Sequence, residues 1–363
     1  MSIDRPEAMN HLSIEVAPVA ASSKTIISSR MTLPAPMPLI LDRSDVRALV
    51  TIPDLVPLME RTLAQFSAGK VEQPLRNVFS IGPDKAYCGV MSAALSNPAA
   101  VGTKLVTIFE HNYKHGLPSH LATVVLLNPE TGALLAVLDG TYITEARTAA
   151  ASAMAAQHLA VPNDGHKLAI VGSGVQARSH LDAFIHALSV KDVRVWSPTE
   201  NHRRQFVNTM STSTDVPLAA TSSAEEAIRG ATLVVLATSS TESVVENDWV
   251  ADGTHVTSIG APIPHQREMD PRLVARARVI VDSRIGALAE SGDIVQGIAE
   301  GHFSETHLVA EIGEVVSGQH QGRTRPDEVT IFKSLGLAVE DVAAAHLAYT
   351  RALEQGRGTV IKL

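Results

Sequence analysis

The 363-residue sequence has one cysteine, few aromatic residues and no excess of positive charge. Because Cys88 is alone, no disulfide can form within the chain, and we predict a reducing compartment, the cytoplasm. The net charge is −8 and no basic run occurs, which argues against nucleic acid as a partner. Aromatic residues make up only 4% of the chain, so platforms for base stacking are not expected either.

Long hydrophobic runs are also missing. No apolar stretch is long enough to span a membrane, so no membrane partner is predicted. Residues 1–37 are rich in Ser, Ala and Pro and lack the basic and apolar regions of a secretory signal. We expect them to form a disordered extension, with Met31 as an alternative start of the natural protein.

The first half of the remaining chain combines helices with a sheet. A cap-type start at Leu41 and the spacing through Phe66 predict helical structure. Short β-branched or alternating runs, separated by turn residues, then predict an antiparallel or mixed sheet. These runs are Tyr87–Ala93, Thr103–Phe109, Ala122–Leu127 and Leu134–Asp139, and an Ala-rich helix is expected after them over Ile143–Leu159.

From Lys167 onward strands and helices alternate, which predicts a doubly wound parallel sheet. The expected strands are 167–171, 192–196, 232–238, 254–259 and 278–282, and the expected helices are 176–188, 200–210 and 223–229. A final helix, Ile331–Leu353, is expected to pack back on the first half. The predicted fold is therefore α/β, with a Rossmann-type domain over 161–326 and a discontinuous α+β domain over 38–160 and 327–363.

A strand that runs directly into a Gly-x-Gly-x-x-Ala turn is the strongest functional signal. The strand Leu168–Val171 is followed by Gly172, Gly174 and Ala177 and then by a helical segment. Glycines let the backbone turn tightly and approach a pyrophosphate, whose charge the helix N-terminus stabilises. The pattern predicts a dinucleotide site, and its alternative is a tight strand–helix turn that binds nothing.

The tip of the second parallel strand bears on the choice of cofactor. An acidic residue there would bind the ribose 2′-hydroxyl of NAD, but this strand ends in Ser197-Pro198-Thr199, and only Glu200 is close. Hydroxyl groups, with His202, Arg203 and Arg204 in the next helix, suit a 2′-phosphate, so we favour NADPH and keep NADH as the second choice. The alternative is that Thr199 simply caps the helix and the arginines are solvated.

Three cations in the first half, Arg76, Lys104 and Arg147, stand among apolar or small residues. A cation in such surroundings needs a partner or a ligand, and the planar fork of arginine suits a carboxylate. Each of them could instead be an ordinary surface or salt-bridged residue. Similarly, His120 could contact the cofactor or pass protons, or be a hydrogen-bonded structural residue.

Two further patterns carry less weight. His111 and His115 share a helical spacing but have no third ligand nearby, so no metal site is predicted. Glu290 and Asp293 form either a working carboxylate pair or, as acidic turns usually do, solvated caps.

Taken together, these residues resemble the ornithine cyclodeaminase/mu-crystallin family from about Leu41 to the final helix. The resemblance rests on motifs in the same order and at matching separations. They are Gln73–Arg76, Tyr87–Met91, Thr103–Thr107, Pro118–His120, Leu138–Gly140, Ile143–Ala150, Gly172–Ala177, Glu290–Asp293 and Phe332–Gly336.

This resemblance implies a homodimer that reduces cyclic imine carboxylates with NAD(P)H, and it makes 38–160 and 327–363 the substrate-binding and dimerisation domain. The substrates implied are Δ1-pyrroline-2-carboxylate and Δ1-piperideine-2-carboxylate, giving proline and pipecolate. It also implies that Arg76 holds the substrate carboxylate, and that Lys104 and Glu290 are catalytic and, with Pro262, face the substrate. The implied cofactor residues are Ser119, His120 and Arg147 at the nicotinamide end, Gly172, Ser173, Gly174, Val175 and Gln176 at the pyrophosphate, Ser197, Pro198, Thr199 and His202 at the adenosine ribose, and Thr238, Ile259 and Ser334 around them.

Two positions depart from the family. Ser197-Pro198-Thr199 stands where the mu-crystallin branch has Asn-Arg-Thr, and the lost arginine weakens the choice of NADPH unless Arg203 or Arg204 replaces it. Pro262 stands where cyclodeaminases carry an aspartate; proline cannot do acid–base work, so deamination of ornithine is disfavoured. The alternatives kept open are an ornithine cyclodeaminase or amino-acid dehydrogenase, and a non-catalytic NADPH-dependent carrier of small molecules.

Overall fold

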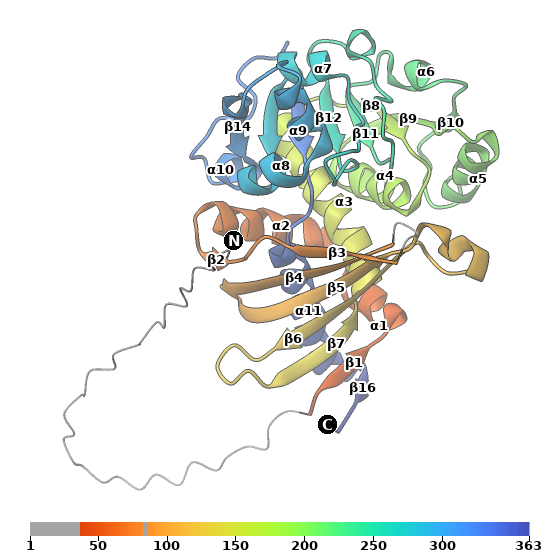
Figure 1. Cartoon of the computed structure of the whole chain (residues 1–363). Coiled ribbons are helices and arrows are strands. Elements are labelled where there is room, and N and C mark those ends of the chain that lie inside the picture. Colours follow the sequence, from red (N-terminus) through yellow and green to blue (C-terminus); the bar gives the residue numbers. More distant parts are fainter. Residues whose placement is uncertain (1–36, 83–85, 363) are drawn as a thin grey trace, which may run out of the picture. The chain divides into compact units, whose positions relative to one another are not determined.

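A computed structural model of the chain describes residues 37–82 and 86–362 (Figure 1). The predictions for residues 1–36, including disorder and the alternative start at Met31, lie outside the described residues. None of the helices in the described ranges is long and apolar enough to cross a membrane.

The first half of the chain, together with β16 from the C-terminal end, forms a mixed sheet in the order β16-β1-β7-β6-β5-β4-β2, with β3 also paired to β4. Its strands are β1 (Leu39–Leu41), β2 (Val71–Glu72), β3 (Asn77–Ile81), β4 (Ala86–Ser96), β5 (Ala99–Ile108), β6 (His120–Leu127), β7 (Leu134–Asp139) and β16 (Thr359–Val360). Strands β1 and β7 run parallel, and the other pairs are antiparallel. The four predicted strands are all present, so this part of the prediction is confirmed.

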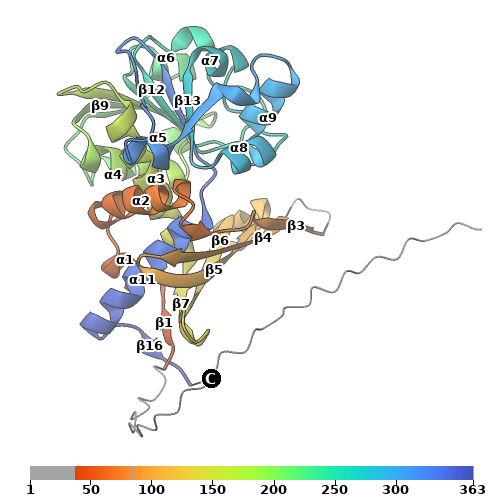
Figure 2. The same ribbon diagram turned by 90° about the vertical axis from the view of Figure 1, so that its left-hand side faces the viewer.

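Helices cover one face of the mixed sheet, as Figure 2 shows for α1 and α11. The helices of this half are α1 (Arg43–Leu49), α2 (Ile52–Ser67), α3 (Gly140–Leu159), α11 (Ala338–Gln355) and the 3-10 helix η1 (Glu110–His115). The helical stretch expected from Leu41 to Phe66 is interrupted, because Val50 is extended and Thr51 starts a new helix through a capping box with Asp54.

Helix α3 joins the two halves of the molecule. It contacts β6 of the mixed sheet and also β12 (His255–Ser258) and β15 (Thr330–Lys333) of the second sheet. All its residues except Tyr142, Gln157 and His158 are buried. Its many alanines allow this, because small side chains let neighbouring elements approach closely on every side. One hydrophobic cluster therefore runs through Leu126, Ala150 and Ile170 from one sheet to the other.

The second half is an eight-stranded sheet in the order β10-β9-β8-β11-β12-β15-β13-β14. All its pairs are parallel. The remaining strands are β8 (His166–Val171), β9 (Val190–Trp196), β10 (Leu218–Ala220), β11 (Leu233–Leu236), β13 (Arg278–Val281) and β14 (Leu308–Glu311). The helices are α4 (Val175–Ala187), α5 (Glu200–Met210), α6 (Ala224–Ile228), α7 (Pro271–Arg276), α8 (Arg284–Glu290), α9 (Gly292–Ala299), α10 (Ile312–Val316), η2 (Asn247–Trp249) and η3 (Glu305–His307). The predicted α/β class, with a Rossmann-type sheet beside a second α+β unit, is confirmed.

The predicted start of the final helix is wrong. Residues Thr330–Lys333 form β15, which lies between β12 and β13, and helix α11 begins only at Ala338. A buried four-residue strand has no periodicity of its own, so Thr-Ile-Phe-Lys can be read as either kind of element. The strands β10 and β14, of three and four residues, were not predicted either. The division of the chain into domains stays a prediction, with β15 on the side of the parallel sheet.

Candidate active site

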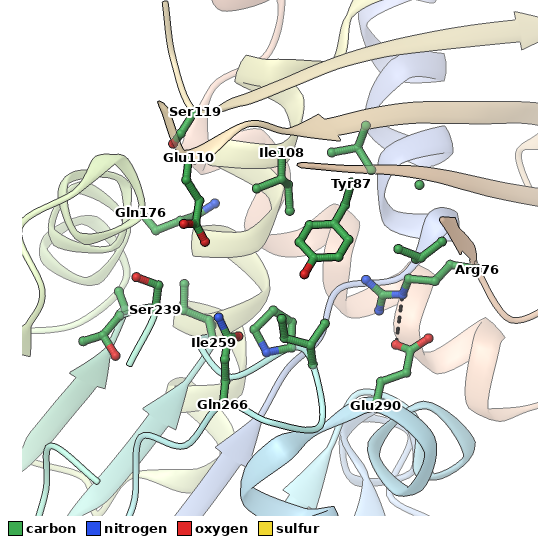
Figure 3. Close-up of a pocket in the computed structure, with 18 of the residues that line it drawn as sticks. Arg76, Tyr87, Ile108, Glu110, Ser119, Gln176, Ser239, Ile259, Gln266 and Glu290 are labelled. Atoms are coloured by element: carbon green, nitrogen blue, oxygen red, sulfur yellow. Dashed lines mark ion pairs between the residues drawn. The ribbon is translucent and has the colours of Figure 1, made fainter. Parts of the chain in front are cut away.

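A cavity of about 930 Å³ lies between the mixed sheet and the segments that follow the carboxyl ends of the parallel strands. In open α/β sheets this edge is where ligands bind. Figure 3 shows side chains from both halves pointing into it. Seven of the predicted site residues line this cavity: Arg76, Ser119, Gln176, Thr238, Ile259, Pro262 and Glu290.

The glycine turn has the geometry that the sequence predicts. After β8, Gly172 has a φ of +121°, and a Cβ there would lie 2.4 Å from the carbonyl oxygen of Ala237. Gly174 occupies the N-cap of the 13-residue helix α4 and offers no side chain to its first N–H groups. Free N–H groups at a helix start form a site for an anion. The turn therefore fits a pyrophosphate, and Ser173 and Val175 lie on it.

Two polar atoms in the cavity wall also fit a ligand. The Oε1 atoms of Gln176 and Gln266 are buried and have no hydrogen-bond partner among the described residues. Buried polar atoms in native proteins are almost always paired, so an unpaired one in a cavity marks a place where a bound molecule completes the bonding. Gln176 directly follows the glycine turn, where the pyrophosphate is expected.

The two arginines near the tip of β9, Arg203 and Arg204, have different partners. Arg203 donates from Nη1 to the carbonyl of Ser197 at 2.9 Å, and Ser173 donates from its hydroxyl to that of Ser197 at 3.0 Å. Arg204 instead forms an ion pair with Glu200 at 2.7 Å. Thr199 is the N-cap residue of α5, but its side chain makes no capping bond. Arg203 is therefore the cation fixed at the strand tip; His202 precedes it in the chain, and Pro198 directly follows Ser197.

Arg76 and Glu290 form an ion pair inside the cavity. The distance from Nε to Oε2 is 3.0 Å, and each side chain is about one-fifth exposed, at 19% and 21% (Figure 3). Arg76 also donates from Nη2 to the carbonyl oxygens of Leu335 and Gly336, at 3.2 and 3.1 Å. Burial raises the pKa of Glu290, although the charge of Arg76 opposes this. The guanidinium is thus held in one orientation in the cavity wall, where an incoming carboxylate would meet it.

The orientation of Arg76 depends on Asp282, a residue that the sequence analysis missed. Its Oδ2 accepts from the N–H groups of Leu335 and Gly336, at 2.6 and 2.7 Å, and from the hydroxyl of Ser334 at 3.0 Å. Ser334, predicted as a cofactor residue, is thus buried and bound to Asp282 rather than to the cavity. An acidic residue directly after the buried strand β13 was the available signal.

Lys104 and Arg147 meet at Asp341 of α11, behind the cavity wall. Lys104 Nζ lies 2.5 Å from one oxygen of Asp341, and Arg147 Nε lies 3.0 Å from the other. Arg147 also binds Glu340 at 2.8 Å. Burial lowers the pKa of Lys104 to about 8, and the charges of Arg147 and Arg76 act in the same direction. The three predicted cations therefore do gather, but only Arg76 lines the cavity.

Arg147, which was predicted to contact the nicotinamide end of the cofactor, does not line the cavity, and that role stays a prediction. Its guanidinium is almost completely buried, and Glu340 and Asp341 occupy it. The sequence could not show this, because Asp341 lies 194 residues further along the chain. His120 lies near the same cluster and does not line the cavity. Burial lowers the pKa of His120 to about 4, helped by Lys104 and Arg147, so it is neutral at physiological pH.

Glu290 and Asp293 do not act as a pair. Glu290 faces the cavity, whereas Asp293 is 2% exposed and binds Lys333 at 3.1 Å. The reading of both as solvated caps is therefore wrong. Among the described residues no group of three His, Cys, Asp or Glu side chains could hold a metal ion.

The apolar part of the wall was also missed, although its signal was present. Residues Tyr87, Gly89 and Met91 alternate along β4, and Val106 and Ile108 alternate along β5. Alternate residues of a strand share one face of the sheet. Once one residue of a strand is assigned to the cavity, the residues two positions away are therefore expected to line it as well.

A doubly wound sheet whose glycine turn faces a cavity at the carboxyl ends of its strands defines the class of dinucleotide-dependent enzymes. Within it, this chain belongs to the ornithine cyclodeaminase/mu-crystallin family, whose model matches residues 37–356. Ketimine reductase mu-crystallin of Mus musculus is 41% identical to this chain over 298 residues, which are 81% of this chain and 91% of the mouse protein.

Solved structures agree with this membership. The Thermococcus litoralis Δ1-pyrroline-2-carboxylate reductase in complex with NADH and L-proline matches with a TM-score of 0.87 and 37% identity, over 89% of this chain and 100% of that one. An archaeal alanine dehydrogenase dimer with bound NAD matches with a TM-score of 0.85 and 32% identity, over 90% and 99% of the two chains. The chain is therefore an NAD(P)-dependent oxidoreductase of this family.

Proposed function

We propose that this protein reduces cyclic ketimine carboxylates, converting Δ1-pyrroline-2-carboxylate to L-proline and Δ1-piperideine-2-carboxylate to L-pipecolate. The observation that supports this most strongly is Arg76, held by two carbonyls and Glu290 within a cavity at the edge where dinucleotides bind. When bound, the reduced nicotinamide supplies the hydride. The relatives that reduce ketimines support the same substrate class.

Different residues of the cavity bind different parts of such a substrate. The guanidinium of Arg76 binds the carboxylate, since its planar donors match two carboxylate oxygens. The methylene groups of the ring pack against the apolar wall formed by Met91, Val106 and Ile108. Glu290 faces the imine nitrogen, and its negative charge favours the protonated imine, which accepts hydride. Holding the two reactants in register contributes several kcal/mol to catalysis.

The imine nitrogen must carry a proton before hydride reaches the adjacent carbon, and the product amine keeps that proton. We assign this proton to Glu290, or to a water molecule bound to it, because Glu290 lines the cavity beside Arg76. Lys104 lies behind the wall on Asp341 and adds positive charge near the carboxylate site. Its predicted role as a direct proton donor stays a prediction.

The charge of Lys104 leads to a prediction about pH. Its ammonium is protonated below a pKa of about 8 and attracts the substrate carboxylate, so kcat/KM should fall as the pH rises through about 8. In Lys104→Arg the side chain stays charged, and this fall should move to higher pH. Ionisation of the substrate affects both proteins equally, so the difference between the two profiles reports on Lys104. Identical pH profiles of kcat/KM for the wild type and Lys104→Arg would show that the charge of Lys104 does not contribute to the reaction.

For the cofactor we propose NADPH, with NADH as the second candidate. Arg203 is fixed at the tip of β9, where Ser197 and Thr199 offer hydroxyl groups and no carboxylate occupies the tip. Against this, Glu200 neutralises Arg204, and the solved relatives contain NADH or NAD. Comparing kcat/KM for the two cofactors decides between them, and a higher value with NADH would overturn the choice.

A panel of substrates tests the proposed function. Purified protein should consume NADPH or NADH when it is given either cyclic ketimine. Release of ammonia from ornithine or alanine would instead indicate a cyclodeaminase or dehydrogenase, although Pro262 in the cavity wall offers no acid–base group. Tight binding of a ketimine without cofactor consumption would indicate a carrier.

We also propose that the protein is a homodimer. The alanine dehydrogenase that it resembles is a dimer, and the mixed sheet exposes Phe79 (51%) and Leu105 (44%). Apolar side chains exposed on a sheet face are typical of a protein interface. The mass in solution, measured by light scattering, should be twice that of the 38.5 kDa chain. A single-chain mass at micromolar concentration would contradict the proposal.

A further inference from the structure

We propose that a buried ionic network of Glu268, Lys333 and Asp293 positions the cavity wall that faces cofactor and substrate. None of the three side chains lines the cavity, and each is at most 2% exposed. Buried charges need partners with good geometry. Here the partners outside the network lie at or next to the ends of β11 and β12, where the chain enters the cavity wall, or directly beside Glu268. The inference rests on the proposed function only for the ligands used in its test.

Glu268 is the centre of this network. Its Oε1 accepts from the N–H and the hydroxyl of Thr238, at 2.7 and 2.8 Å. Its Oε2 accepts from the hydroxyl of Ser258 at 2.8 Å and from the N–H of Gly260 at 2.9 Å. Thr238 and Gly260 both line the cavity and follow two neighbouring parallel strands, β11 and β12. A single carboxylate thus ties together the ends of both strands.

Lys333 and Asp293 hold the same segment from its other side. Lys333 Nζ donates to the hydroxyl of Ser258 at 3.0 Å, to Asp293 at 3.1 Å and to the carbonyl of Gly260. The second oxygen of Asp293 accepts from the N–H groups of Glu268 and Met269, at 2.8 and 3.0 Å. Lys333 thereby uses all three donors of its ammonium group. Peptide groups of Gly260 are consequently bound on both sides, the N–H by Glu268 and the C=O by Lys333.

The wall needs such support because its backbone is unusual. Ala261 has a φ of +51°, in the left-handed region that residues with a Cβ rarely adopt. A Cβ on Gly260 would lie 2.3 Å from Oε1 of Glu268, so only glycine fits beside this carboxylate. The next residues, Pro262 and Ile263, line the cavity. Backbone held in a sparsely populated conformation next to a cavity is typical of preorganised functional sites.

Directional bonds suit this task better than apolar packing would. Apolar contacts tolerate small shifts, whereas Glu268 and Lys333 each specify the positions of several groups at once. A displacement of about 1 Å at a reacting centre can cost about 100-fold in rate. We therefore assign these residues a positioning role: they act on the reaction through Thr238, Ile259 and Pro262.

Two variants of different severity test this role. In Glu268→Gln one oxygen becomes an NH2 group, which cannot accept from the N–H of Thr238 or of Gly260. Ser258→Ala removes only the hydroxyl that bridges Glu268 and Lys333; it leaves Lys333 paired with Asp293, and Glu268 bound by the N–H groups of Thr238 and Gly260. The matched control is Thr254→Val. Thr254 directly precedes β12, at the end of the strand away from the cavity, and its buried hydroxyl donates to the carbonyl oxygen of Ala231.

The readouts are the Kd of NADH and of NADPH from fluorescence titration, kcat and KM with Δ1-piperideine-2-carboxylate, and Tm. Below its Tm, Glu268→Gln should lower kcat/KM by about 10- to 100-fold and weaken cofactor binding, and Ser258→Ala should do the same by about 3- to 10-fold. Thr254→Val should lower Tm and leave the kinetic constants unchanged.

If both variants change Tm alone, as the control does, the network is merely structural and the proposal is overturned. If Glu268→Gln does not fold, Ser258→Ala decides by the same criterion. If the wild-type protein reduces no ketimine, the proposed function fails, but the Kd values still decide whether the network positions the wall.

Discussion

Replacing Arg76 by alanine is expected to lower kcat/KM for Δ1-piperideine-2-carboxylate by about 100- to 1,000-fold, with little change in the Kd of the cofactor. The guanidinium is the cation that lines the cavity among the three predicted ones, and the carbonyls of Leu335 and Gly336 orient it. Its loss removes the partner of the substrate carboxylate and leaves Glu290 unpaired, which repels that carboxylate. Steady-state kinetics and fluorescence titration of NADPH measure the two quantities.

Two further variants make this result specific. Arg76→Lys keeps the positive charge but loses the planar pair of donors that binds both carboxylate oxygens, so its kcat/KM should lie between those of Arg76→Ala and the wild type. Arg43→Ala breaks another arginine–glutamate pair of the same half, with Glu145, and should leave kcat/KM unchanged. An Arg76→Ala protein that reduces the ketimine like the wild type would exclude Arg76 from substrate binding.

Arg147→Leu is expected to lower the free energy of unfolding by about 3–5 kcal/mol at pH 8. The buried guanidinium neutralises Glu340 and Asp341, and removing it leaves two carboxylates facing only Lys104. Burial raises the pKa of Glu340 to about 7, so lowering the pH protonates this group and should reduce the loss. Urea denaturation at pH 8 and pH 6 measures both effects.

A partly exposed pair provides the control for this variant. Arg351 binds Asp54 at 2.6 Å with side chains that are 31% and 25% exposed, so Arg351→Leu should cost only about 1 kcal/mol. If Arg147→Leu instead kept its stability and lost cofactor binding, the result would support the role at the nicotinamide that the family resemblance predicts.

The predictions from sequence succeeded where the signal is local. The glycine turn depends on one strand, one turn and one helix that are consecutive in the chain, and the structure contains all three. Arg76 and Glu290 were also named as site residues, and they meet in the cavity although they belong to different halves of the chain. The resemblance to a family assigned both residues to the substrate, because no local rule connects two residues so far apart; their ion pair became visible only in the structure.

The points that the sequence left open or that were predicted wrongly have a common physical cause. The lone cations Lys104 and Arg147 called for a partner or a ligand, and a single sequence cannot tell which of the two exists. Likewise the last three residues of β15, from Ile331, were predicted as helix, since this strand is buried and shows no periodicity. Burial and pairing are properties of the assembled fold.

The sequence by itself thus determined the α/β class, the glycine turn and the family, because these follow from short-range periodicity and from motifs in order. Only the tertiary structure decided the partners of the charges. Helix α11 brings Asp341 to Lys104 and Arg147, and strand β15 brings Lys333 to Asp293 and Gly260. An ion pair between distant segments exists only after the chain has packed, because its free energy depends on burial and distance rather than on neighbours in sequence.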